Sequence, residues 1–314
     1  MHSLLATRGR HDAIRMLHVA DTPEPRVVRT AGERVVGYYE FGDPLGTPVV
    51  ALHGTPACGA GFAWADDRAR ARGIRLLAPD RPGVGISDRW VAGSGATVEA
   101  YGAELRAFAE ALELPTFSVI GYSGGGPYAL AAAHALADCV NAVAVVSGSG
   151  QVGEWASIND FETTDRLLTR LSLHLPVVAR AVLDVGALAS RVAPKTSLWF
   201  GQIEMSAPDR AVMAEFPSAR AALAMFTQSC DHGARGVVDD YAALGRPWGF
   251  AVEEITVPVQ CWHATTDPIV PLHHTDELVR RIPGAQVTHW DGGGHLAIID
   301  RIDEVFDALL VASS

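Results

Sequence analysis

Short apolar segments alternate with amphipathic segments along most of the chain. The early apolar runs, rich in Val, Ile and Leu, are residues 49–52, 74–78, 117–120 and 140–146. Such runs are typical of strands that are buried on both faces. From Val98 to Leu112 apolar residues recur every three or four positions, which predicts a helix, with Thr97 placed to cap its start. This alternation favours an α/β fold with a mainly parallel sheet.

The alternation stops after Gly150, and for roughly a hundred residues the pattern is helical without strands. Pro176, Pro194, Pro208, Pro217 and Pro247 divide this stretch into short helices. Strand signals return at 257–263 and 285–290, with helices predicted at 275–282 and 298–310.

These patterns predict how the chain is divided. We expect an N-terminal tail over residues 1–25, a core formed by 26–149 and 247–314, and an inserted helical cap over 150–246. The cap should cover the active site as a lid and select the substrate, while the catalytic machinery lies wholly in the core.

Composition narrows the possible partners. With 36 acidic and 25 basic residues the formal charge is -11, which disfavours nucleic acid and anionic membranes. No stretch of 18 apolar residues marks a membrane span, and no apolar run near the N-terminus marks a signal peptide. The four cysteines are dispersed, as expected for reduced thiols. We therefore expect a cytoplasmic protein with a small-molecule substrate.

One motif carries a candidate nucleophile. Gly121-Tyr122-Ser123-Gly124-Gly125 follows a predicted strand and precedes a helical run. A serine on such a tight turn exposes its hydroxyl above the sheet, and small neighbours are required because side chains would collide with nearby backbone. We predict that Ser123 is the nucleophile.

A serine hydroxyl needs a base, and the base needs an acid to fix its tautomer. His295 follows the last predicted strand after three glycines, and Asp267 follows the preceding strand. Both therefore lie at the carboxyl ends of strands, where open α/β sheets bind ligands. We predict a catalytic triad of Ser123, His295 and Asp267, with Asp291 as the second choice for the acid.

The remaining site predictions concern the oxyanion and the substrate. Thr55, after the strand at 49–52, and Gly124, beside the nucleophile, are the candidate backbone N–H donors of an oxyanion hole. The side chains assigned to the substrate pocket are His53, Tyr122, Trp155 and Phe226.

Other tempting motifs favour structural roles. Gly83-Val84-Gly85 lacks the third glycine of a dinucleotide fingerprint. His273, His274 and Asp276 stand at a predicted helix start without a second group of ligands, which is more typical of a solvated terminus than of a metal site. We predict neither a metal nor a cofactor.

Together these motifs resemble those of the capped α/β-hydrolases, from about Arg34 to Leu310. The resemblance rests on His53-Gly54-Thr55-Pro56, on the run from Asp80 to Asp88, and on the loops described above. It implies an eight-stranded sheet and hydrolysis through an acyl-enzyme. The oxyanion loop lacks the His-Gly-Gly-Pro-Gly form of prolyl aminopeptidases, and serine replaces the aspartate nucleophile of haloalkane dehalogenases and epoxide hydrolases.

The first functional hypothesis is therefore a serine hydrolase for a carboxylic ester, or a related acyl bond, of a small to medium apolar substrate. Two alternatives stay open. One is a cofactor-free lyase or perhydrolase that uses the same triad. The other is a catalytically weak ligand receptor, because a fold alone does not fix a function. The oligomeric state is left open.

Overall fold

The computed structural model describes residues 23–90, 95–216 and 219–312. Its centre is an eight-stranded sheet in the order β1-β2-β4-β3-β5-β6-β7-β8. The strands are β1 (Arg26–Arg29), β2 (Val35–Gly42), β3 (Thr47–Leu52), β4 (Ile74–Pro79), β5 (Phe117–Tyr122), β6 (Val140–Val146), β7 (Val259–Ala264) and β8 (Gln286–Trp290). Only β2 pairs antiparallel, with β1 and β4, and the remaining pairs are parallel. The predicted eight-stranded, mainly parallel sheet is confirmed.

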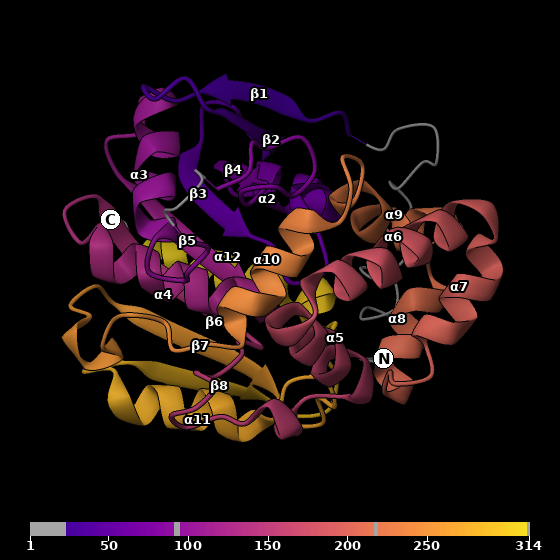
Figure 1. The fold of residues 1–314 in the computed structure, drawn as a ribbon. Coiled ribbons are helices and arrows are strands. Elements are labelled where there is room, and N and C mark those ends of the chain that lie inside the picture. The colour runs from indigo at the N-terminus through magenta and orange to yellow at the C-terminus, as the bar shows by residue number, and fades with distance from the viewer. Residues whose placement is uncertain (1–22, 91–94, 217–218, 313–314) are drawn as a thin grey trace.

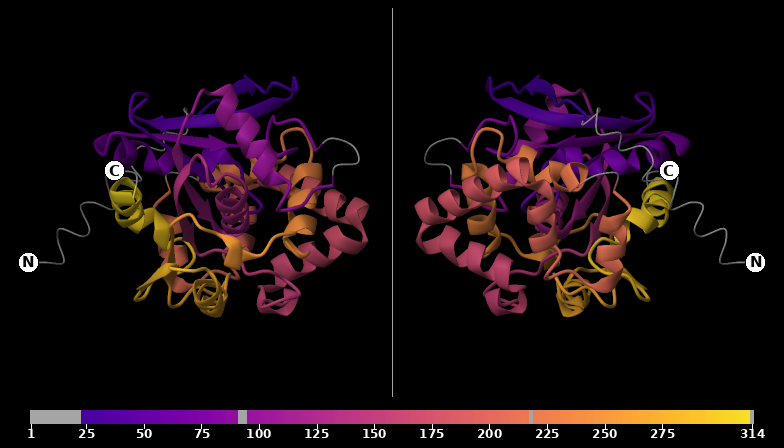
Figure 2. Two further views of the ribbon diagram at one scale, coloured as in Figure 1. Left: turned by 90° about the vertical axis from the view of Figure 1, so that its left-hand side faces the viewer. Right: turned by 90° about the vertical axis from the view of Figure 1, so that its right-hand side faces the viewer.

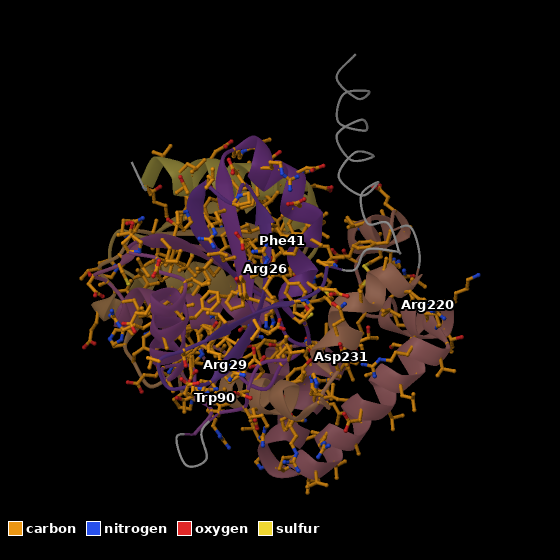
Figure 3. The ribbon with its side chains drawn as sticks, turned by 90° about the horizontal axis from the view of Figure 1, so that it is seen from above. Arg26, Arg29, Phe41, Trp90, Arg220 and Asp231 are labelled. Carbon is orange, nitrogen blue, oxygen red and sulfur yellow. The ribbon has the colours of Figure 1, made fainter. Side chains whose placement is uncertain are left out.

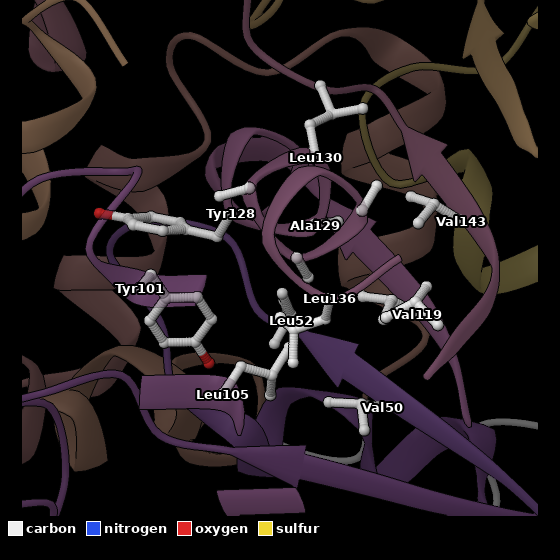
Figure 4. Packing of buried hydrophobic residues seen from close by; sticks show 14 of the residues in the cluster. Val50, Leu52, Tyr101, Leu105, Val119, Tyr128, Ala129, Leu130, Leu136 and Val143 are labelled. Atoms are coloured by element: carbon white, nitrogen blue, oxygen red, sulfur yellow. The ribbon is translucent and has the colours of Figure 1, made fainter. Parts of the chain in front are cut away.

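Helices cover both faces of the sheet (Figures 1 and 2). One face carries α3 (Tyr101–Ala111), α4 (Gly126–Ala135) and α11 (Leu272–Arg281). The other carries η1 (Gly59–Ala65), α2 (Asp66–Ala71) and α12 (Ala297–Ala312). Helix α4 is buried from Gly126 to Ala133, and its small side chains let it lie close to the strands that carry Val50 and Val119 (Figure 4). The apolar runs of the sequence therefore form a core on each side of the sheet.

Between β6 and β7 the described chain forms helices joined by loops and no named strand, as predicted. The elements are η3 (Ile158–Asp160), α5 (Thr163–His174), α6 (Pro176–Val192), α7 (Pro194–Gly201), α8 (Ala207–Ala214), α9 (Ala219–Ser229), α10 (Arg235–Leu244) and, after them, η4 (Val252–Glu254). Seen from above, the helices near Arg220 and Asp231 stand beside the part of the sheet that carries Arg26 and Phe41 (Figure 3). We call α5 to α10 the inserted helices.

Prolines shape the inserted helices at their starts. Pro176, Pro194 and Pro208 occupy the first turns of α6, α7 and α8, where a missing backbone N–H costs no hydrogen bond. Pro217 lies outside the described residues.

Some boundaries differ from the prediction. Helix α3 begins at Tyr101, and the Thr97 hydroxyl instead accepts from the N–H of Ala100, in the turn before it. Helix α11 begins at Leu272, three residues before the predicted start. In the part of the chain that the structure describes, no helix has the length and hydropathy to cross a membrane.

Candidate active site

Ser123 lies at the tight turn between β5 and α4. Its φ of 54° is in the left-handed region, which a non-glycine residue adopts only where the surrounding structure holds it there. A Cβ on Gly121 would stand 2.6 Å from Cβ of Ala129 and 2.6 Å from O of Gly125, so the close approach of helix to strand requires glycine. The packing of α4 on β5 thus fixes the serine at the carboxyl edge of the sheet.

His295 and Asp267 form a hydrogen-bonded pair. His295 Nδ1 lies 2.8 Å from Asp267 Oδ2, and the other carboxylate oxygen accepts from the N–H groups of Ile269 at 2.9 Å and Val270 at 3.1 Å. Because a carboxylate can only accept, His295 Nδ1 carries the proton toward it. The Nε2 atom of a neutral His295 is then left as a proton acceptor, as a general base requires.

Electrostatics stabilise the charged form of this pair. Burial alone would lower the pKa of His295, but the charge and hydrogen bond of Asp267 outweigh burial and raise that pKa, with smaller contributions from Asp209 and Asp165. Burial likewise opposes ionisation of Asp267, yet His295 and His263 together hold its pKa well below its usual range. Asp267 is therefore an anion when His295 is positioned beside it.

A residue that the sequence analysis missed holds the His295 loop. Asp209, in the first turn of α8, is 1% exposed and accepts from the N–H groups of His295 at 3.1 Å and Leu296 at 2.8 Å. The Ser206 hydroxyl donates to the same carboxylate at 2.7 Å. A Cβ on Gly294 would lie 2.1 Å from Asp209 Oδ2, which explains one of the three glycines before His295. The sequence showed Asp209 only as a residue near a helix start.

A second missed contact orders the candidate oxyanion loop. The Arg81 guanidinium is fully buried and donates to the carbonyl of Gly54 and to the hydroxyl of Thr55, each at 2.9 Å. Its charge is paired with Asp240 of α10, at 2.7 Å. The face of the Tyr128 ring lies 4.7 Å from the guanidinium carbon. Arg81 therefore ties the oxyanion loop to an inserted helix.

Thr55 and Gly124, predicted as oxyanion donors, lie side by side. A Cβ on Gly124 would stand 2.9 Å from the Thr55 hydroxyl oxygen, and a Cβ on Gly54 would stand 3.5 Å from Ser123 Oγ. His53 is buried, with Nδ1 2.8 Å from the carbonyl of Gly54. Burial, reinforced by Arg81, holds the pKa of His53 well below its usual range, so its ring is neutral and braces the loop.

These groups open onto one cavity of about 540 Å³. Ser123, His295, Tyr122, His53 and Thr55 all line it. No hydrogen bond joins Ser123 Oγ to His295 within the described residues, although both face this space. Its walls are mostly apolar and include Phe62, Trp64, Met213, Phe216, Met225 and Leu296. The cavity thus combines the predicted chemistry with side chains from η1 and from the inserted helices α8 and α9.

Two predicted pocket residues do not line this cavity. Trp155 packs edge-to-face on Trp248, with ring centroids 5.3 Å apart, and lies under the guanidinium of Arg281. Phe226 points toward α6, where its ring would be 3.6 Å from a Cβ on Gly186. Successive residues of a helix point about 100° apart, so its neighbour Met225 faces the cavity while Phe226 does not. The structure therefore turns both side chains away from the cavity that Ser123 lines.

Asp165 of α5 brings a further carboxyl group to the cavity. Tyr241 donates to its Oδ1 at 2.6 Å, and no basic side chain pairs with it among the described residues. Burial raises the pKa of Asp165, although the Tyr241 hydrogen bond and the charge of His295 oppose the rise. The cavity therefore contains one acidic wall group close enough to His295 to influence its charge.

His273 and His274, at the start of α11, lie next to a carboxylate in the structure. That carboxylate belongs to Asp160 of η3 and not to Asp276, which the sequence analysis had grouped with them. His274 Nδ1 accepts from the N–H of Gly150 at 3.1 Å, so in neutral His274 the proton is on Nε2, which lies 3.3 Å from Asp160. That Nε2 has no lone pair to offer a metal ion. The contacts explain this cluster as a link between η3 and α11.

The sequence matches the family model described as the alpha/beta hydrolase fold over residues 47–302. The chain belongs to this family. Among curated proteins it resembles an uncharacterized protein of Mycobacterium tuberculosis, with 24% identity over 231 residues. That match covers 73% of this chain and only 64% of the relative, so the chain spans less than two thirds of the relative's length.

Solved structures support the same fold for this α/β-hydrolase family member. The esterase RhEst1 from Rhodococcus sp. aligns with a TM-score of 0.65 at 22% identity, covering 93% of this chain and 99% of the esterase. The enol-lactonase from Burkholderia xenovorans gives 0.64 at 18%, covering 91% and 97%. A bromoperoxidase from Bacillus anthracis gives 0.68 at 20%, covering 92% and 99%. Likeness at these identities concerns the fold alone.

Proposed function

We propose that this protein is a serine hydrolase that cleaves a carboxylic ester of a small to medium apolar acid or alcohol. The observation that carries the proposal is that Ser123 and His295 line one mainly apolar cavity, with His295 hydrogen-bonded to Asp267 behind it. Membership of the α/β-hydrolase family and the fold shared with an esterase and a lactonase support it.

The chemistry follows from the proton positions. His295 Nε2 takes the hydroxyl proton as Ser123 Oγ attacks the ester carbonyl, and the carbonyl oxygen becomes an anion beside the N–H groups of Thr55 and Gly124. The required contact between Nε2 and Oγ commonly tightens only when substrate is bound. Collapse of this intermediate expels the alcohol, which takes the proton from His295. Water, activated in the same way, then releases the acid and restores Ser123.

The cavity walls support an apolar ester. Its volume of about 540 Å³ lies within the roughly 300–1,000 Å³ typical of small-molecule sites. Phe62, Met213 and Met225 offer apolar and polarizable contacts to an acyl or alkyl chain.

The test is labelling by a fluorophosphonate probe combined with turnover of p-nitrophenyl esters of graded chain length. Ser123→Ala should abolish labelling and lower turnover by about a thousand-fold or more. Ser149→Ala is the matched control, because Ser149 is also buried and its N–H donates to the Ser123 carbonyl. Undiminished turnover in Ser123→Ala, with the control equally active, would sink the proposal.

A further inference from the structure

Helix α6 turns a continuous apolar stripe toward solvent. Val178, Val182, Val185, Leu188 and Val192 each expose between 46% and 75% of their surface. Helix α6 runs along the outside of the molecule (Figures 1 and 2), and no described element packs over this stripe. Isolated exposed aliphatic residues are ordinary on protein surfaces, but a row of them along one helix marks an interface.

The opposite side of α6 is buried against other inserted helices. Ala179, Leu183 and Ala187 are buried against α5 and α10, in a small core of the inserted helices. Next to this buried side, Ser190 and Arg191 line the cavity. The stripe is therefore not an internal face that the fold has left incomplete.

The charges of α6 lie off the stripe and are paired. Arg180 bonds to Asp184 at 3.2 Å, and Arg191 bonds to Asp231 at 2.8 Å. The stripe positions 178, 182, 185, 188 and 192 are separated by steps of four, three, three and four and hold only Val and Leu, and the neighbouring Ala189 is also exposed. That spacing is the pattern of a helix that packs along another helix. A partner helix that packs on the stripe would therefore contact no unpaired charge of α6.

Further exposed apolar side chains lie on the helix next to α6. Trp199, Phe200 and Ile203, on and just after the adjacent α7, are also exposed by 60–63%. A stable interface buries roughly 800 Å² per partner, so a dimer contact would use these side chains as well as the α6 stripe. The largest apolar patch of a typical monomer is only about 300–600 Å². The number of exposed apolar side chains on α6 and α7 therefore favours a protein partner.

We propose that the α6 stripe docks on the α6 stripe of a second copy of this chain, antiparallel across a two-fold axis. In such a contact the same residues serve both partners, and an uncharged seam avoids placing like charges opposite one another. A membrane surface fits less well, because a chain with a formal charge of -11 is repelled by anionic lipid. Since the same helix contributes Ser190 and Arg191 to the cavity, association would also brace the wall of the site.

The first test is the mass in solution at micromolar concentration, measured by light scattering after size-exclusion chromatography. The native chain should have twice the monomer mass of 33.3 kDa. Val185→Lys should be monomeric, with dimer affinity lowered about a hundred-fold or more by two buried lysines facing each other. Leu45→Lys is the matched control and should remain dimeric, because Leu45 is 95% exposed but lies far from α6 in sequence, before β3. A monomeric native chain would overturn the proposal.

A second test does not depend on how the lysine variant folds. Val185 lies near the middle of α6, so across a two-fold axis it meets its own copy. Val185→Cys, oxidised with copper phenanthroline, should give a covalent dimer far faster than Leu45→Cys or the native chain with its own four cysteines. Equal rates would refute the contact.

Sedimentation of the native chain with phosphatidylcholine vesicles, lost in Val185→Lys, would assign the stripe to a membrane instead. None of these readouts depends on ester hydrolysis.

Discussion

Two buried carboxylates from the inserted helices hold the loops around Ser123. Asp240 forms an ion pair with the guanidinium of Arg81, and the guanidinium also donates to the hydroxyl of Thr55 in the oxyanion loop. Asp209 accepts two backbone N–H groups of the His295 loop. Neither carboxylate is needed as a reactant in the proposed chemistry. Each acts by fixing the backbone on which a reacting group stands, which is a requirement of catalysis by positioned groups.

Replacement of Asp240 tests the buried pair. Asp240→Asn leaves the charge of Arg81 buried without a partner, which should lower the free energy of unfolding by about 3–5 kcal/mol. Asp239→Asn is the control, because Asp239 pairs with Arg89 at the surface and should cost about 1 kcal/mol or less. Urea unfolding measures both. Equal losses would show that the Arg81 pair contributes no more than an ordinary surface contact.

The carboxyl group of Asp165 should affect the pH profile. The negative charge of Asp165 contributes to the raised pKa of His295, so Asp165→Asn should lower that pKa. In the proposed reaction, ester hydrolysis should rise as His295 loses its proton, so the acid limb of the kcat/KM profile should move to lower pH. Asp291→Asn, at an exposed residue of the same loop as His295, should leave the limb in place. An upward shift in Asp165→Asn would contradict this account.

At the scale of single residues, the sequence predicted those whose local context is distinctive. Ser123, Asp267 and His295 each follow an apolar strand, and the structure brings all three to one edge of the sheet. Asp209 and Asp240 lack any such local signal, since each acts on a segment remote in sequence. Trp155, in the turn before η3, and Phe226, on α9, are bulky aromatic residues of the kind that line pockets. The direction of each side chain depends on packing that a sequence does not show.

At the scale of elements, one side of α9 faces the cavity and another packs toward α6. Met225 faces the cavity, whereas its neighbour Phe226 packs toward α6. The core elements were easier to predict than this arrangement, because strands buried on both faces and an amphipathic helix such as α12 have strong periodic patterns. The order of helices in the insertion was visible, but which side each turns inward was not.

The two neighbours on α9 provide a paired test of substrate selection. Met225→Ala enlarges the cavity and should shift the relative kcat/KM between short and long p-nitrophenyl esters by about ten-fold, if the contact persists in the transition state. Phe226→Ala should instead cost about 2 kcal/mol of folding free energy, below the range for a fully buried ring, and leave relative rates unchanged. Ester preferences that respond to Phe226 and not to Met225 would reverse the assignment of the two faces.

At the scale of the whole molecule, the sheet and the inserted helices share the candidate site. We expected the catalytic machinery to lie wholly in the sheet domain. The proposed reacting groups Ser123, Asp267 and His295 do lie in the sheet domain. The carboxylates of Asp209 and Asp240, which hold the loops around them, come from α8 and α10. The fold class could be predicted from chain-wide periodicity, whereas this dependence arises from contacts between segments far apart in the chain.

The Arg81–Asp240 pair has a consequence for protein engineering. Replacing the inserted helices with those of a relative, by cutting after β6 and before β7, would remove Asp240 and leave the buried guanidinium of Arg81 without its partner. A transplant that keeps α10 of the recipient, and supplies an acid where Asp209 stands, preserves both supports. The same constraint applies to natural variation. Residues that line the cavity can change freely as long as the carboxylates of Asp209 and Asp240 are kept in place.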